Sequence, residues 1–271
     1  MLWELLCGFI VIAALVFEWA RRYHSVRIIE AWRRGLVEDD EELFRQPPPR
    51  DDCPVCFLRL PMIHEQKYQP CCGKTICCGC MDAVQQRANV SAPICPFCRA
   101  PCINDEVLRQ LKVRASMKDA NAIGLLGRFQ ANGEYGIPRD TKKGIEMLSI
   151  AARLGNVSAC GLLGNFYHPY FISIPGVDKD YEKAIHYYEL AAMGGLEEAR
   201  TNLGCLLILQ SKESNRFKKY YMIMVAMTHF LIAAAQGYDE ALKLVKDGYV
   251  QGFITKDEFA QALRAHKDSK K

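Results

Sequence analysis

The stretch "LAAMGGLEEARTNLGCLL", residues 190–207, has counterparts elsewhere in the chain. "IAARLGNVSA" (150–159) and "IAAAQGYDEA" (232–241) match its first half. One glycine is in register in all three copies, at Gly155, Gly195 and Gly237, with separations of 40 and 42 residues. Upstream of the alanines, each of the first two copies has a basic-acidic helix start. Repetition at this period predicts stacked pairs of antiparallel helices joined by glycine turns.

A second block follows the first two copies and also occurs earlier in the chain: "CGLLGNFY" (160–167), "RTNLGCLL" (200–207) and "AIGLLGRF" (122–129). The pattern resembles Sel-one-like repeats, which are tetratricopeptide-related helical hairpins. The signature pairs are Ala122 with Gly127, Ala159 with Gly164 and Ala199 with Gly204, together with "KAIHYYELAAMGG" at 183–195. Over roughly residues 119–241, the resemblance implies a helical solenoid whose concave face binds a protein substrate or adaptor.

The third unit departs from this pattern, because "QSKESNRFKKYYMIMVAMTHF" (210–230) is longer than a normal turn and helix. Its loop conformation therefore stays open. Further on, Thr255 and Glu258 have the spacing of a capping box, which predicts a closing helix that covers the last apolar face of the solenoid.

Ten of the thirteen cysteines lie between Cys53 and Cys102. Eight of them are spaced as possible ligands: Cys53-x2-Cys56, then adjacent Cys71 and Cys72, then Cys77-x2-Cys80, then Cys95-x2-Cys98. Zinc takes four sulfur or nitrogen ligands in a tetrahedron, and a C-x2-C turn can aim two sulfurs at one ion. In a chain of this length the spacing favours metal ligands over a disulfide framework. The sequence therefore predicts two zinc ions.

The order of these pairs resembles a RING finger, in which the first and third pairs hold one ion and the second and fourth hold the other. The resemblance implies a first zinc at Cys53, Cys56, Cys77 and Cys80, and a second at Cys95, Cys98 and two ligands from 71–74. In the common form a histidine stands where this chain has Lys74, and an ammonium group cannot bind a metal. We therefore expect Cys71 and Cys72 to complete the second site. His64 competes for this role, Cys102 stays open as a further alternative, and Cys78 is expected to be a free thiol.

Zinc with four protein ligands has no open position, so both ions are expected to be structural. The resemblance implies a ubiquitin ligase that positions a ubiquitin-conjugating enzyme and ubiquitin without a covalent intermediate on this protein. The residues that match the enzyme-binding groove are Val55, Ala83, Val84 and Pro96, and Arg99 matches a basic linchpin that contacts both partners. Alternatively, these are ordinary packing and solvated residues, and the protein is a non-catalytic scaffold for protein–protein interaction.

The first twenty residues, "MLWELLCGFIVIAALVFEWA", are apolar except for two glutamates. A helix of this length spans about 30 Å, which is the thickness of a hydrocarbon core. A signal peptide would need a basic start and a small-residue cleavage site, and a buried core helix would need an equally apolar partner. We therefore expect a single-pass membrane anchor. The arginines of "RRYHSVR" (21–27) predict that the zinc finger and repeats face the cytosol.

The expected fold class is mostly α, with a small two-zinc cross-brace RING-type domain before a helical hairpin-repeat solenoid. The expected segments are a transmembrane helix (1–20), a juxtamembrane helix with the proline linker "QPPPR" (21–50), the zinc finger (51–103), the repeats with their closing helix (104–265) and a frayed tail (266–271). The chain has a net charge of +4 and no long basic face, and its repeats lack aromatic residues interleaved with basic ones, so no nucleic-acid partner is expected.

Overall fold

The computed structural model describes residues 41–87, 93–171 and 176–270. These residues divide into two compact units, one made of 41–45 with 204–270 and the other of 46–203. We name them unit 1 and unit 2. The predicted anchor (1–20) and most of the predicted juxtamembrane helix lie outside the described residues. Within those residues, no helix is both long and apolar enough to cross a membrane.

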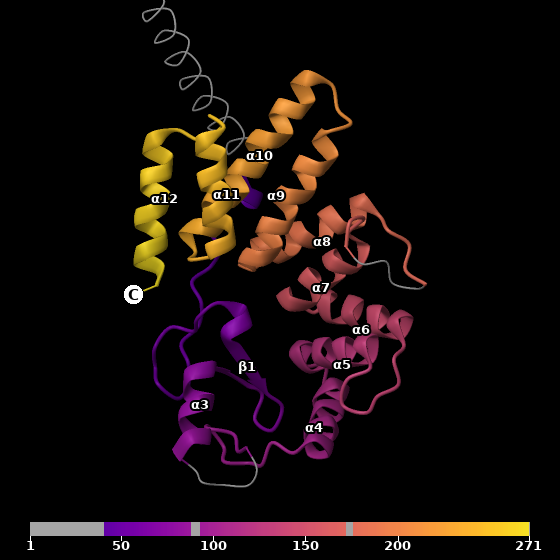
Figure 1. Ribbon diagram of the computed structural model, residues 1–271. Coiled ribbons are helices and arrows are strands. Elements are labelled where there is room, and N and C mark those ends of the chain that lie inside the picture. The colour runs from indigo at the N-terminus through magenta and orange to yellow at the C-terminus, as the bar shows by residue number, and fades with distance from the viewer. Residues whose placement is uncertain (1–40, 88–92, 172–175, 271) are drawn as a thin grey trace, which may run out of the picture. The chain divides into compact units, whose positions relative to one another are not determined.

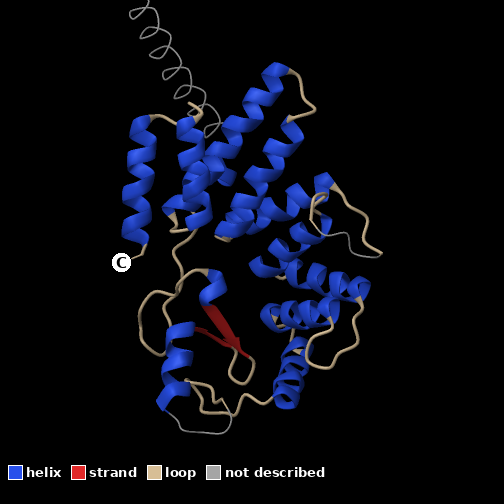
Figure 2. Ribbon diagram, in the orientation of Figure 1, coloured by secondary structure: helices blue, strands red, loops and turns tan. Residues whose placement is uncertain are grey.

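Unit 2 begins with the linker 46–50, which has no helix or strand, and continues into a cysteine-rich segment with few regular elements. The short helix η1 (Ile63–Glu65) leads into an antiparallel hairpin of β1 (Gln66–Gln69) and β2 (Lys74–Cys77), and α3 (Cys78–Arg87) follows. In the hairpin Gln66 pairs with Cys77 and Gln69 with Lys74, so the loop between the strands contains Cys71 and Cys72. Figure 2 shows these two strands in red.

The rest of unit 2 is helical, as the sequence predicts. Its helices are α4 (Asn104–Ser116), α5 (Ala120–Asn132), α6 (Thr141–Arg153), α7 (Val157–Tyr167), α8 (Tyr181–Met193) and the start of α9 (Glu197–Ser211). Consecutive helices α5 to α8 pack against one another (Figure 1). An Asp or Asn caps the start of each of these four: Asp119, Asp140, Asn156 and Asp180.

The glycine turns and the small helix residues have the roles that the repeat pattern predicts. Gly155 and Gly195 have left-handed φ values of 87° and 91°, which allow the chain to reverse between helices. Within α7, a Cβ atom at Gly164 would lie 2.4 Å from the ring of Tyr188, a residue of α8. The ring of Tyr188 is fully buried, so glycine at this position allows the two helices to approach closely.

Unit 1 contains the end of α9 and then α10 (Arg216–Ala235), α11 (Asp239–Val250) and α12 (Lys256–Ser269), with α2 (Glu41–Phe44) from before the linker. The predicted capping box is confirmed, because Thr255 and Glu258 exchange both hydrogen bonds at the start of α12. The helix continues to Ser269, so residues 266–269, predicted as frayed, are helical. The open question about the third repeat is also answered: a short turn after Ser211 leads into a 20-residue helix.

Candidate metal centre

The structure brings together a first group of four cysteines from two separate parts of the segment. Cys53 and Cys56 lie on the first C-x2-C turn, Cys77 ends β2, and Cys80 lies in the first turn of α3. Their four Sγ atoms all lie within 4.8 Å of one another. The Cys53–Cys80 and Cys56–Cys77 sulfurs are each 3.9 Å apart.

The second group joins the hairpin loop to the last C-x2-C turn. Cys71 and Cys72 come from the loop, Cys95 and Cys98 from the turn, and their Sγ atoms also lie within 4.8 Å of one another. The Cys72–Cys95 sulfurs are 3.9 Å apart, and those of Cys71 and Cys98 are 3.3 Å apart. In the loop, the amide of Gly73 donates to the carbonyl of Gln69 at 2.7 Å. This tight turn allows two adjacent cysteines to point to one centre.

The two C-x2-C turns have the same backbone geometry. Phe57 N donates to Cys53 O at 2.9 Å, and Arg99 N donates to Cys95 O at the same distance. The residue after each second cysteine adopts a left-handed conformation, with φ of 60° at Phe57 and 64° at Arg99. Left-handed non-glycine residues are uncommon, and here they turn the chain sharply around each pair of sulfurs. The two turns are therefore structurally equivalent, and each contributes two cysteines to a different group.

Both groups fit a tetrahedral metal ion. Four sulfurs at about 2.3 Å from zinc are about 3.8 Å apart. Three of the sulfur–sulfur distances given above are 3.9 Å, and the Cys71–Cys98 distance is shorter, at 3.3 Å. Burial and the neighbouring thiols raise the pKa of Cys71 and of Cys80 well above the usual range for cysteine. Crowded sulfurs resist becoming thiolates together unless a cation is among them, and a divalent ion provides that charge. Each group of four cysteines could therefore hold one metal ion.

The competing residues lie outside both groups. His64 is in η1 and belongs to neither group. The Sγ of Cys102 lies 3.7 Å from Oε1 of Gln69, and Cys78, at the start of α3, is half-buried beside the first group. Lys74 lies at the start of β2, with its ammonium nitrogen 6.0 Å from the centre of the Phe97 ring. The role assigned to Cys71 thus fits the geometry better than its alternative, His64.

The residues predicted to contact a conjugating enzyme differ in exposure. Arg99 and Ala83 are exposed, and Val55 and Val84 are half-buried. Pro96, by contrast, is buried, so it supports the second turn from within more than it offers a surface.

Sequence reasoning missed three exposed apolar side chains beside the C-x2-C turns. Phe57 is 78% exposed, Leu58 70% and Phe97 47%. All three lie on or directly after a C-x2-C turn. Apolar residues next to the second cysteine of each pair were the available signal.

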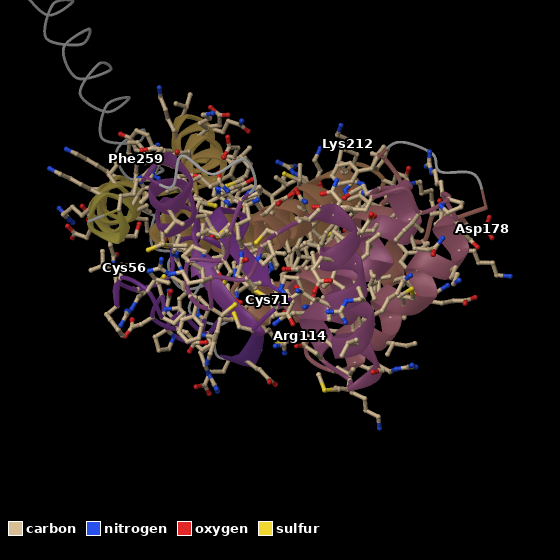
Figure 3. All side chains as sticks on the ribbon, turned by 90° about the horizontal axis from the view of Figure 1, so that it is seen from below. Cys56, Cys71, Arg114, Asp178, Lys212 and Phe259 are labelled. Atoms are coloured by element: carbon tan, nitrogen blue, oxygen red, sulfur yellow. The ribbon has the colours of Figure 1, made fainter. Side chains whose placement is uncertain are left out.

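Two contacts within unit 2 join the cysteine-rich segment to the helices. Tyr68 in β1 donates from its hydroxyl to Oδ2 of Asp119, the residue that caps α5, at 2.5 Å. Arg114 in α4 donates to the carbonyl of Pro70, next to Cys71 (Figure 3). Burial and the nearby Asp119 carboxylate raise the pKa of Tyr68, so its hydroxyl remains protonated and can donate. The hairpin that contains half of the second group is therefore held against α4 and α5.

Comparison with known proteins identifies the repeats. The family model for the Sel1 repeat matches residues 120–156 and 157–196, which correspond to the α5–α6 and α7–α8 hairpins. The chain therefore contains Sel1 repeats. A crystal structure of a Sel1 repeat protein from Oxalobacter formigenes superposes with a TM-score of 0.51 at 19% identity, covering 64% of this chain and 67% of that one. This likeness shows the repeat-solenoid fold.

A second similarity, to curated proteins, covers 51 residues of the chain. They are 35% identical to "E3 ubiquitin-protein ligase GW2" of Oryza sativa subsp. indica, covering 19% of this chain and 11% of that protein. "E3 ubiquitin-protein ligase DA2" of Arabidopsis thaliana is 33% identical over the same length, with 12% of that protein covered. The chain thus spans about a tenth of the length of these curated relatives.

Proposed function

We propose that residues 51–103 form a RING-type zinc finger with two structural zinc ions, and that the protein is a ubiquitin ligase. In this proposal, the finger positions a ubiquitin-conjugating enzyme and its bound ubiquitin, and the Sel1 repeats bind the substrate or an adaptor. The observation that carries the proposal is the interleaving of the cysteines. The first and third pairs form one group and the second and fourth form the other, as in a cross-brace. The partial similarity to two E3 ubiquitin-protein ligases supports it.

The zinc ions, when bound, supply rigidity and no open coordination position. The protein surface that they stabilise must therefore bind the conjugating enzyme and ubiquitin. Phe57 and Leu58, which follow Val55 closely in the sequence, are exposed, and exposed apolar side chains that gather in patches are typical of protein-binding sites. Arg99 is exposed and occupies the position in the second turn that Phe57 occupies in the first. Its guanidinium can donate hydrogen bonds to two partners at once. We expect it to hold the conjugating enzyme and ubiquitin in an orientation ready for transfer.

The test is discharge of ubiquitin from a panel of charged conjugating enzymes to free lysine, with the full chain as catalyst. We expect wild-type protein to accelerate discharge with at least one enzyme, and Arg99→Gln to lower that rate by about tenfold or more. Arg59→Gln is the matched control, because Arg59 is an exposed arginine just after the first turn. Absence of any acceleration by zinc-loaded wild-type protein across the panel would rule out the ligase function.

One observation favours the alternative of a non-catalytic scaffold. The exposed face of α3 offers the small side chain of Ala83 beside a half-buried Val84, and no large apolar contact. A scaffold would bind its partners through the repeats and the finger but would leave the rate of discharge unchanged. The same discharge assay therefore distinguishes the two functions.

We propose further that residues 1–20 anchor the protein in a membrane, with the zinc finger and repeats in the cytosol. The support is the apolar run followed by arginines. Extraction of membranes with alkaline carbonate tests it. An anchored chain stays in the pellet, and release into the supernatant would contradict the proposal.

A further inference from the structure

A basic and aromatic surface lies in unit 1, where α9 ends and α10 begins. Its members are the exposed residues Lys212, Arg216, Phe217, Lys218, Lys219 and Tyr221, and we name it the α10 surface (Figure 3 labels Lys212). Phe217 is 70% exposed and Tyr221 is 42% exposed. Neither the proposed ligase function nor the repeat pattern accounts for this combination of cations and exposed rings.

The α10 surface borders a groove of about 560 Å³ that has both basic and apolar lining residues. Arg216 and Lys219 contribute its basic lining. Its apolar lining includes Ile223 and the rings of Tyr220 and Phe253, whose centroids are 6.0 Å apart. A groove with cationic and apolar linings fits an amphiphile that has an anionic head.

Within the described residues, the positive charge of the α10 surface is not neutralised by ion pairs. Among the residues that the structure describes, Lys212, Arg216, Lys218 and Lys219 take part in no ion pair. Between residues 212 and 221, Glu213 is the single acidic residue. Four cations with one anion give this short stretch a local charge of +3, which attracts a negatively charged partner.

We propose that the α10 surface binds the anionic face of a lipid bilayer, with Phe217 inserted among the headgroups. Charge complementarity is one argument, because juxtamembrane lysines and arginines bind anionic leaflets. The exposed aromatic rings are a second, since such rings favour the membrane–water interface.

The course of the chain supports the same occupant. The forty residues that precede α2 include the predicted anchor, and α2 packs on α10 through Phe44, which clusters with Met224 and Ile232. Phe44, which follows the predicted anchor in the sequence, thus packs on α10, the helix whose N-terminal part contributes most of the α10 surface. This inference does not depend on ligase activity.

Hydrogen exchange of the full chain tests the proposal. The protein is incubated with vesicles of phosphatidylcholine alone and with vesicles that also contain phosphatidylserine. We expect amides between residues 212 and 221 to exchange about fivefold more slowly with the anionic vesicles, and high salt to abolish the difference. Equal exchange with both kinds of vesicle would overturn the proposal.

A matched pair of variants separates a specific surface from general charge. Lys218→Gln with Lys219→Gln removes two cations from the first turn of α10, and we expect it to remove most of the protection. Lys142→Gln with Lys143→Gln removes two exposed cations from the first turn of α6, and we expect it to leave the protection intact. Equal loss in both double variants would overturn the assignment. So would protection by single-stranded RNA but not by anionic vesicles.

Discussion

The cysteine-rich segment and the repeats are stabilised by different means. In residues 51–103 the cluster of buried apolar side chains consists of Cys53, Leu60, Ile76 and Cys95, and two of these four are candidate metal ligands. The α5–α8 hairpins instead bury leucine, isoleucine and alanine side chains between helices. We expect a small segment with so few buried apolar groups to need a metal ion in order to fold, whereas the repeats gain their stability from packing. From this difference we expect that loss of metal would unfold the cysteine-rich segment and leave the repeats folded.

Removal of metal should separate the two regions most clearly. We expect two zinc ions per chain and, after treatment with a strong chelator, unfolding of residues 51–103 with the helices of 120–250 retained. Binding of a structural zinc contributes about 10–16 kcal/mol to folding, so this is the largest effect. Metal analysis and hydrogen exchange before and after chelation measure it. Loss of the helices together with the metal would contradict the separation.

Single cysteine substitutions sharpen the comparison within the first region. Cys71→Ser should reduce the metal content from two ions to one, because Cys71 belongs to the second group. Cys78→Ser is the matched control, since Cys78 lies beside a ligand but in neither group, and should keep both ions. Loss of an ion in His64→Ala would show instead that the second site uses the histidine.

The grouping of the cysteines could be predicted from their spacing and from the resemblance to RING fingers. The two cysteines of a C-x2-C turn are held close together, which limits the ways in which the cysteines can form two groups. The helical hairpins likewise followed from the repeated glycines and alanines. The left-handed conformations at Phe57 and Arg99 could not be predicted, because neither residue type favours a positive φ. The hydrogen bond between Tyr68 and Asp119 also escaped prediction. It joins residues 51 positions apart, and its formation depends on how the hairpin lies against α4 and α5.

A core substitution in the repeats tests the second region. Leu163 in α7 is fully buried in a cluster with Ile123 and Leu148. Leu163→Ala should lower the free energy of unfolding of the helices by about 2–5 kcal/mol and leave the zinc content unchanged. The control is Leu154→Ala, because Leu154 is 44% exposed and should change stability little. Denaturation followed by helical circular dichroism measures both variants. A fall in metal content in Leu163→Ala would mean that the two regions fold as one.

The smallest expected effect concerns the hydrogen bond that joins the regions. Tyr68→Phe removes the hydroxyl that donates to Asp119 but keeps the ring packed against α4 and α5. The free energy of unfolding should fall by about 1 kcal/mol. Tyr135→Phe is the control, because Tyr135 is 42% exposed and its hydroxyl has no hydrogen-bond partner among the described residues.

The pH dependence of the same variant gives a sharper result. Burial and Asp119 raise the pKa of Tyr68 above its unfolded value of about 10. Its contribution to stability is therefore fully present below pH 10 and is lost as the pH rises through the folded-state pKa, where a phenolate would face a carboxylate. Wild-type protein should lose stability relative to Tyr68→Phe as the pH rises above about 10. If the difference between the two proteins is constant from pH 8 to about 11, the hydroxyl does not join the regions in the way that the contact implies.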